Sequence, residues 1–198
     1  MKDSKSILLV GVGGQGTILA SKILSEGLLQ AGYDVKMSEI HGMSQRGGSV
    51  STQIRFGEKI NSPIIGIGEA DVLVAFERME ALRWIEYLKP GGQMIVNDFA
   101  IPSLPVLMGT CEYPEGIIEE LQSKTNLIIL NAQEIALELG NSKAMNIVLL
   151  GAAVKALNNQ FSGEHADIDW HEIIKDSVKS SFVDINILAF EKGHAAGK

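Results

Sequence analysis

The chain has 198 residues, of which 45% are hydrophobic and 21% are charged, and its formal net charge is -7. This size and composition are typical of one ordered domain spanning residues 1–198, and they exclude a disordered arm or linker. The acidic balance and the lack of a basic run argue against a nucleic-acid partner, because nonspecific binding to phosphate backbones depends on clustered lysine and arginine.

The first half of the chain alternates strand and helix patterns. Residues 7–10 form a continuous apolar run that ends in glycines, which is typical of a strand covered on both faces. Residues 14–31 carry apolar side chains at helical spacing, and Gly32 supplies a stop. Residues 35–40 are predicted to be a second strand that completes a βαβ unit, and the alternating residues 49–56 predict a strand with one wet face.

The second half continues the alternation and then becomes helical. We predict strands at 72–76, 94–96 and 127–130, a helix reaching Leu88, a turn at 90–92, an irregular region around Pro102, Pro105 and Pro114, and helices at 117–123, 132–139, 144–157 and 170–191. The expected fold class is α/β: a Rossmann-like, mostly parallel sheet with helices on both faces and a C-terminal helical segment.

Location and metal chemistry are constrained by two features. The N-terminal apolar run has only four residues, too few for a signal-peptide core or a membrane span, so we expect a cytoplasmic protein with no membrane partner. The one cysteine, Cys111, can form no internal disulfide and cannot supply a thiolate cluster or zinc site. We therefore expect no metal ligands in this chain.

A glycine-rich loop lies between the first predicted strand and helix. It comprises Gly11, Val12, Gly13, Gly14, Gln15 and Gly16 and fits the G-x-G-x-x-G pattern in the right context. Such glycines let the backbone approach a ligand closely, and the unpaired amides at a helix N-terminus favour a phosphate. The alternative is that they only permit tight packing of strand against helix.

Two nucleotide-binding functions can be examined at this loop. An NTPase would need a lysine followed by serine or threonine, where this chain has Thr17 and Ile18. A nicotinamide site would need an acidic residue near the end of the second strand, where Glu39 stands. The sequence thus disfavours an NTPase and leaves nicotinamide binding open.

A second loop, residues 41–48, follows the second predicted strand at the edge where open α/β sheets place their sites. Arg46 can direct a forked donor at a phosphate or carboxylate, or pair with a carboxylate of this chain or a partner. Arg46 also replaces the second glycine that a serine nucleophile elbow requires, which disfavours serine hydrolysis. For His41 an ordinary hydrogen bond is favoured over proton transfer.

Polar residues follow two further strands. Glu77 and Arg78 come after residues 72–76, and Asn97 and Asp98 come after residues 94–96. Both pairs are expected at the carboxyl edge of the sheet, where they line a cleft or, as we favour, cap helices and form turns.

With both glycine loops, the sequence resembles the gamma-type domain of the 2-oxoacid:ferredoxin oxidoreductase family, and especially the beta subunits of its indolepyruvate-type enzymes. The resemblance covers nearly the whole chain. It rests on residues 11–16, residues 38–48, Asn146 with Gly151 and Ala152, and the tail pattern Asn186, Ala189, Phe190 and Gly193.

This resemblance implies a subunit that supports oxidative decarboxylation of aryl pyruvates, with coenzyme A accepting the acyl group and ferredoxin accepting the electrons. An alpha-type partner subunit would carry the thiamine diphosphate and the [4Fe-4S] clusters, so that this chain would bind no cofactor alone. The chain has no Gly-Asp-Gly thiamine motif and no cysteine series, in agreement with that division. Pyruvate and branched-chain 2-oxoacids remain open as substrates.

The resemblance carries over to the two loops as candidates for contacts with coenzyme A or the partner. These candidates are Gly11, Gly13, Gly14, Gln15, Gly16, Ser44, Gln45, Arg46, Gly47 and Gly48. No catalytic residue is predicted. Two alternatives stay open: a stand-alone NAD(P)-binding reductase, and a noncatalytic scaffold subunit whose loops touch only the partner.

Overall fold

The computed structural model describes residues 4–41, 47–160 and 168–197. These residues form one six-stranded sheet with the order β2-β3-β1-β4-β5-β6. Its strands are β1 (Lys5–Val12), β2 (Asp34–His41), β3 (Ser49–Gly57), β4 (Ala70–Ala75), β5 (Leu88–Asn97) and β6 (Asn126–Leu130). The pairs β1–β4, β4–β5 and β5–β6 are parallel, and β3 alone runs against its neighbours.

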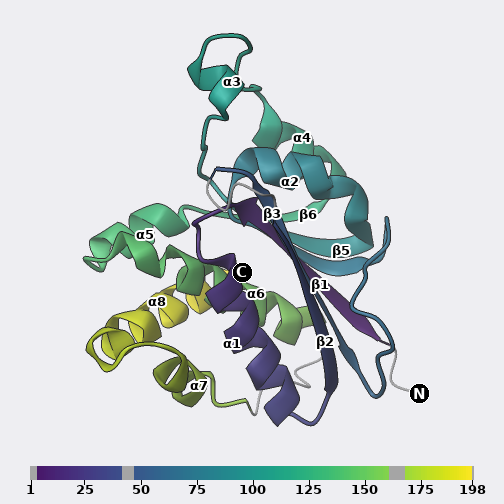
Figure 1. The fold of residues 1–198 in the computed structure, drawn as a ribbon, viewed down its shortest axis with the longest axis vertical. Helices are drawn as coiled ribbons and strands as arrows, with labels where there is room; N and C mark the ends of the chain where they lie inside the picture. The colour runs from purple at the N-terminus through teal and green to yellow at the C-terminus, as the bar shows by residue number, and fades with distance from the viewer. Residues whose placement is uncertain (1–3, 42–46, 161–167, 198) are drawn as a thin grey trace.

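Helices cover both faces of the sheet (Figure 1). The helices are α1 (Thr17–Gln30), α2 (Arg78–Trp84), α3 (Leu104–Leu107), α4 (Ile117–Lys124), α5 (Ala132–Glu138), α6 (Met145–Gln160), α7 (Trp170–Ser177) and α8 (Val183–Ala196), with short 3-10 turns at Ile85–Tyr87, Ser142–Ala144 and Ser180–Phe182. One face carries α1 and α5 to α8, and the other carries α2 and α4. The predicted fold class is confirmed.

Strand β1 explains why the sheet needs helices on both sides. Ile7 and Leu9 point into the core formed with α1, α6 and α8, whereas Leu8 and Val10 point into a smaller core with α2 and α4. All four side chains are buried. A run of apolar residues without alternation is stable only where both of its faces lose contact with water.

The place of β3 differs from the expected βαβ unit. Strands β1 and β2 point in the same direction and α1 crosses between them, but β3 lies between the two and pairs with both. Hydrophobic periodicity predicts the elements themselves and does not specify which strands are neighbours. The antiparallel insertion brings the start of β3, with Gly47 and Gly48 before it, to the glycine-rich end of β1.

The prediction of a wet face on β3 is wrong at Ser51 and Gln53, which are both buried. The segment between β3 and β4 folds over that face, and the Ile65 amide donates a 2.6 Å hydrogen bond to Gln53 Oε1. A polar side chain with a backbone partner can be buried without a large penalty. Alternation of polar and apolar residues therefore did not mean exposure to solvent here.

Three smaller predictions also differ from the structure. The predicted turn at 90–92 belongs to the irregular start of β5, where the register with β4 shifts. The proline-rich region contains the short helix α3. The helix predicted at 170–191 is two helices, because the backbone is extended at Val178 and Lys179 and α8 then packs along α6.

Two glycines of the family resemblance, Gly151 and Gly193, allow α6 and α8 to touch. A Cβ at Gly151 would lie 2.1 Å from the Phe190 carbonyl oxygen, and one at Gly193 would lie 1.8 Å from the Val148 carbonyl oxygen. No side chain fits at such distances, so the two backbones are in direct contact. The C-terminal helix is thereby fixed onto the helix that also supports the glycine loop.

We expect Gly193→Ala to lower the free energy of unfolding by about 2–4 kcal/mol, because the added methyl forces α8 away from α6. Helix propensity alone acts in the opposite direction, since alanine is favoured over glycine in a helix interior by about 1 kcal/mol. Urea denaturation of the chain measures the difference. Stabilisation by this substitution would contradict the close packing inferred here.

Candidate functional site

The two glycine loops are in contact. The Gly13 amide donates a 2.9 Å hydrogen bond to the Gly48 carbonyl, and the Gly47 amide donates a 3.4 Å hydrogen bond to the Gly13 carbonyl. Gly47 has a left-handed φ of 79°, which a glycine adopts without strain. Ser44, Gln45 and Arg46 lie outside the described residues, so the structure places this loop only at its ends.

Gln15 joins the ends of β1 and β4. Its Oε1 accepts a 2.7 Å hydrogen bond from the Val12 amide, and its Nε2 donates a 2.8 Å hydrogen bond to the Phe76 carbonyl. A Cβ at Gly11 would lie 2.8 Å from Gln15 Oε1 and 2.9 Å from Phe76 Cβ. Gly11 and Gln15 thus close the crevice between these two strands with protein atoms.

Gly16 begins α1 and is held by a distant helix. It has a φ of 81°, and its carbonyl accepts a 3.1 Å hydrogen bond from Asn146 Nδ2 on α6. A Cβ at Gly16 would lie 2.5 Å from that nitrogen. No side chain caps the N-terminus of α1, and the first amides of a helix have no acceptor within it.

A cavity of about 340 Å³ lies beside this N-terminus. It is lined by Gly13, Gly14, Gly16, Thr17, Ile18, Glu39, Ile40, His41, Val50, Ser51 and Thr52. The glycine loop, the end of β2 and the start of β3 therefore share one hollow, which we call the glycine-loop pocket. Its volume lies at the small end of the range for ligand pockets, so it suits one portion of a nucleotide-sized ligand.

The pocket combines three kinds of chemistry. Open amides and the dipole at the start of α1 favour an anion. Glu39 contributes a buried Oε1 atom to which no group among the described residues donates a hydrogen bond. Ile18 and Ile40 add apolar surface that is half-exposed. A ligand that fits all three would carry a phosphate, an N–H or O–H donor and an apolar segment.

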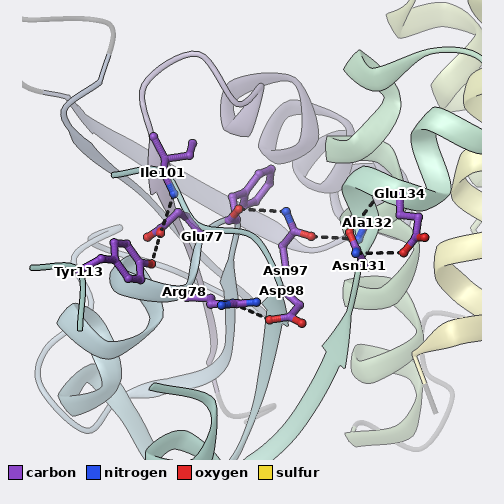
Figure 2. Close-up of polar contacts among 10 residues, drawn as sticks. Glu77, Arg78, Asn97, Asp98, Ile101, Tyr113, Asn131, Ala132 and Glu134 are labelled. Carbon is purple, nitrogen blue, oxygen red and sulfur yellow. Dashed lines mark hydrogen bonds and ion pairs between the residues drawn. The ribbon is translucent and has the colours of Figure 1, made fainter. Parts of the chain in front are cut away.

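A second polar cluster includes Glu77, Arg78, Asn97 and Asp98, which follow or end β4 and β5 (Figure 2). The buried side chain of Asn97 donates a 3.1 Å hydrogen bond to the Phe76 carbonyl and accepts a 2.9 Å hydrogen bond from the Ala132 amide at the start of α5. Since the Phe76 carbonyl also accepts from Gln15, one chain of hydrogen bonds crosses the carboxyl edge from β1 to α5.

The Glu77 side chain is buried and has three donors. Its Oε2 accepts a 3.0 Å hydrogen bond from the Glu80 amide and so caps α2, as predicted. Its Oε1 accepts from the Ile101 amide at 3.1 Å and from the Tyr113 hydroxyl. Burial and the adjoining Glu77 raise the pKa of the Tyr113 hydroxyl, so it stays protonated and continues to donate at neutral pH.

Arg78 and Asp98, the other residues of these pairs, form an ion pair that is about one-third exposed (Figure 2). The Asp98 amide also donates a 2.9 Å hydrogen bond to the Leu130 carbonyl of β6. Arg78 and Asp98 also line a hollow with Tyr113 and the start of α4, so the cleft alternative applies to these two residues. None of the four residues lines the glycine-loop pocket.

Sequence patterns missed the long-range partners of the site. Asn146 lies 130 residues from Gly16, and Tyr113 lies 36 residues from Glu77. Ser49, at the start of β3, donates to the buried Glu80 of α2. The only signal for Asn146 was its place in the family resemblance, which gave no contact.

Within the described ranges, no group of three or more histidine, cysteine, aspartate or glutamate side chains is arranged to hold a metal ion. The same residues contain no helix with the length and apolar character needed to cross a membrane.

Comparison with known proteins defines the family. The model of the pyruvate ferredoxin/flavodoxin oxidoreductase family matches residues 6–196. The chain belongs to this family. The indolepyruvate oxidoreductase subunit IorB of Pyrococcus horikoshii is 40% identical, over 98% of this chain and 96% of that protein. The resemblance stated from the glycine loops and the tail pattern is confirmed.

Solved structures share the fold of this pyruvate ferredoxin/flavodoxin oxidoreductase family member. The gamma subunit of a keto/oxoacid ferredoxin oxidoreductase from Geobacter sulfurreducens has a TM-score of 0.69 at 24% identity and covers 98% of both chains. A 2-oxoglutarate:ferredoxin oxidoreductase from Magnetococcus marinus, with 2-oxoglutarate, coenzyme A and succinyl-CoA bound, has a TM-score of 0.71 at 20% identity. There this chain corresponds to only 31% of a longer polypeptide.

We expect Asn97→Leu to lower the free energy of unfolding by about 2–4 kcal/mol, because the Phe76 carbonyl loses one donor and the Ala132 amide loses its acceptor. The matched change Asn61→Leu, at an exposed position, should alter stability by less than about 0.5 kcal/mol. Urea unfolding measures both. Equal effects of the two substitutions would show that the hydrogen-bond chain does not hold the edge together.

Proposed function

We propose that this chain is the small subunit of an indolepyruvate-type 2-oxoacid:ferredoxin oxidoreductase, and that its glycine-loop pocket contacts coenzyme A in the assembled enzyme. The family match and the 40% identity to an indolepyruvate oxidoreductase subunit over nearly the full chain support the first part. The second part rests on one observation: the start of α1 and Glu39, whose Oε1 has no donor among the described residues, line the same cavity.

In the proposed reaction an aryl pyruvate loses its carboxylate as carbon dioxide. The acyl group passes to the sulfur of coenzyme A, and the two electrons released pass to ferredoxin. Thiamine diphosphate and [4Fe-4S] clusters would supply the carbanion and electron chemistry on the alpha-type partner, and ferredoxin would meet the complex there. Residues of this chain would bind and orient the acyl acceptor and take no part in bond making.

The chemistry of coenzyme A fits the pocket in parts. A phosphate at the start of α1 would meet unpaired amides and the positive end of the helix dipole. Gly14 has a φ of 102°, and a Cβ placed there would have no atom within 4 Å, so its backbone is open to a ligand. Glu39 would accept a hydrogen bond from a hydroxyl or amide of the ligand. Arg46 stays a candidate for the phosphate, together with Ser44 and Gln45.

The reductase alternative conflicts with the geometry of the sheet. Dinucleotides bind across the crevice at the point where strand order reverses, which here lies between β1 and β4. Gln15 spans that crevice with two hydrogen bonds. Titration with a nicotinamide cofactor, followed by the fluorescence of Trp84 and Trp170, tests this directly: micromolar binding to the isolated chain would favour the reductase.

We expect the chain alone to be inactive and its complex with the alpha-type subunit to reduce ferredoxin when given an aryl pyruvate and coenzyme A. Copurification of the tagged chain from its native cell, followed by iron, thiamine and ferredoxin-reduction assays, measures this. Turnover by the chain alone, or a recovered partner without iron and thiamine, would refute the subunit assignment.

Ile18→Asp separates a ligand role of the pocket from a structural one. An acidic residue in the first turn of α1 should leave stability unchanged or raise it by about 0.3–1 kcal/mol. It should weaken coenzyme A binding to the complex by about tenfold or more, because the new charge repels a phosphate. Ile18→Asn is the control, because asparagine is similar in size to aspartate and neutral. It should change the affinity for coenzyme A by less than about threefold.

Calorimetric titration of coenzyme A into the two variant complexes gives the answer. Equal affinity for Ile18→Asp and Ile18→Asn would favour the scaffold alternative, in which the loops touch only the partner.

A further inference from the structure

Residues 102–116, between β5 and α4, stand away from the body of the molecule, with α3 at their tip (Figure 1). We call this segment the excursion. All of these residues are exposed except Val106 and Tyr113. Leu104, Leu107 and Met108 are 68%, 71% and 69% exposed. We call these three side chains the apolar knob.

The excursion is held at its base by one buried carboxyl group. Glu77 is 1% exposed, and its Oε1 accepts from the Ile101 amide on the outgoing stem and from the Tyr113 hydroxyl on the returning stem. At the tip, the Thr110 hydroxyl donates a 2.9 Å hydrogen bond to the Pro105 carbonyl. The knob is therefore presented on an ordered support, which reduces the entropy lost when a partner binds it.

The rest of the described chain leaves the knob uncovered: its three side chains are exposed, and α3 lies at the far end of residues 102–116 (Figure 1). Clustered apolar side chains on an exposed surface mark an interaction site more often than scattered ones do. The segment around them is acidic: residues 102–116 include Glu112 and Glu115 and contain no lysine or arginine. A partner surface complementary to the knob and its acidic surroundings would be an apolar hollow bordered by basic side chains.

We propose that the apolar knob inserts into an apolar, basic-rimmed socket on the larger subunit of the complex, an inference that rests on the proposed function. The same fold forms 31% of a longer polypeptide in the Magnetococcus marinus structure, where the neighbouring domains are covalently attached. A separate chain must achieve that attachment through its surface. A second copy of this chain is disfavoured as the occupant, because each copy carries a formal charge of -7 and an acidic rim.

The test uses the larger subunit recovered with the tagged wild-type chain and titrated against purified variants. Leu107→Ser combined with Met108→Ser should weaken association by about tenfold or more. The control combines Ile64→Ser with Ile67→Ser, at side chains 54% and 69% exposed on the segment that joins β3 to β4, outside residues 102–116. It should stay within about twofold of wild type.

A second pair of variants tests the rim. Glu112→Lys combined with Glu115→Lys should weaken association most at low salt, because screening removes the attraction of exposed charges as ionic strength rises. Stronger binding of this variant would show that the socket is acidic and would overturn the proposed complement.

The outcomes separate this proposal from the proposed function. An active complex that binds the Leu107→Ser/Met108→Ser variant as tightly as wild type overturns the knob and leaves the function intact. Failure of the wild-type chain to recover any larger subunit overturns both. Knob-dependent self-association of the isolated chain, measured by sedimentation equilibrium, would identify a second copy as the occupant and would equally refute the socket.

Discussion

The carbonyl oxygen of Phe76 is the point on which the carboxyl edge of this sheet depends. It accepts hydrogen bonds from Gln15, which reaches over from the end of β1, and from Asn97, which ends β5 and passes the connection on to α5. An edge built from three strands and two helix starts has many backbone groups that would be costly to bury unpaired. The amide side chains of Gln15 and Asn97 pair three of these groups and tie the strand ends together.

The same arrangement decides where a ligand can enter. With the crevice between β1 and β4 filled by Gln15, the glycine-loop pocket lies on the side of β2 and β3, beside the start of α1. Different glycines of the loop then serve the two roles considered for it, which are packing and close approach to a ligand. Gly11 and Gly16 have no room for a Cβ and serve packing, whereas Gly14 faces open space. Of these three glycines, only Gly14 is free to approach a bound molecule.

The sequence was sufficient to predict the six strands and the helices on both faces, because apolar runs and glycine positions are local signals. It was insufficient for the neighbours of β3, because periodicity does not specify strand order. It was also insufficient for the buried face of β3, since an alternating pattern is compatible with burial when a residue such as Gln53 finds a backbone donor. It was also insufficient for Asn146 and Tyr113, whose partners are brought near by tertiary packing of α6 and of the excursion. Pairings of that kind leave no periodicity in the chain.

Glu77 connects the glycine-loop pocket with the apolar knob because it follows Phe76 directly. A buried carboxyl group is costly unless donors surround it, and here the donors come from the start of α2 and from both stems of the excursion. The residue that precedes it anchors the edge beside the glycine-loop pocket, and the excursion that it holds carries the apolar knob. Phe76 and Glu77, two adjacent residues at the end of β4, therefore fix the position of α3 relative to the pocket edge. A partner docked on the knob would then be held in a defined position relative to the pocket.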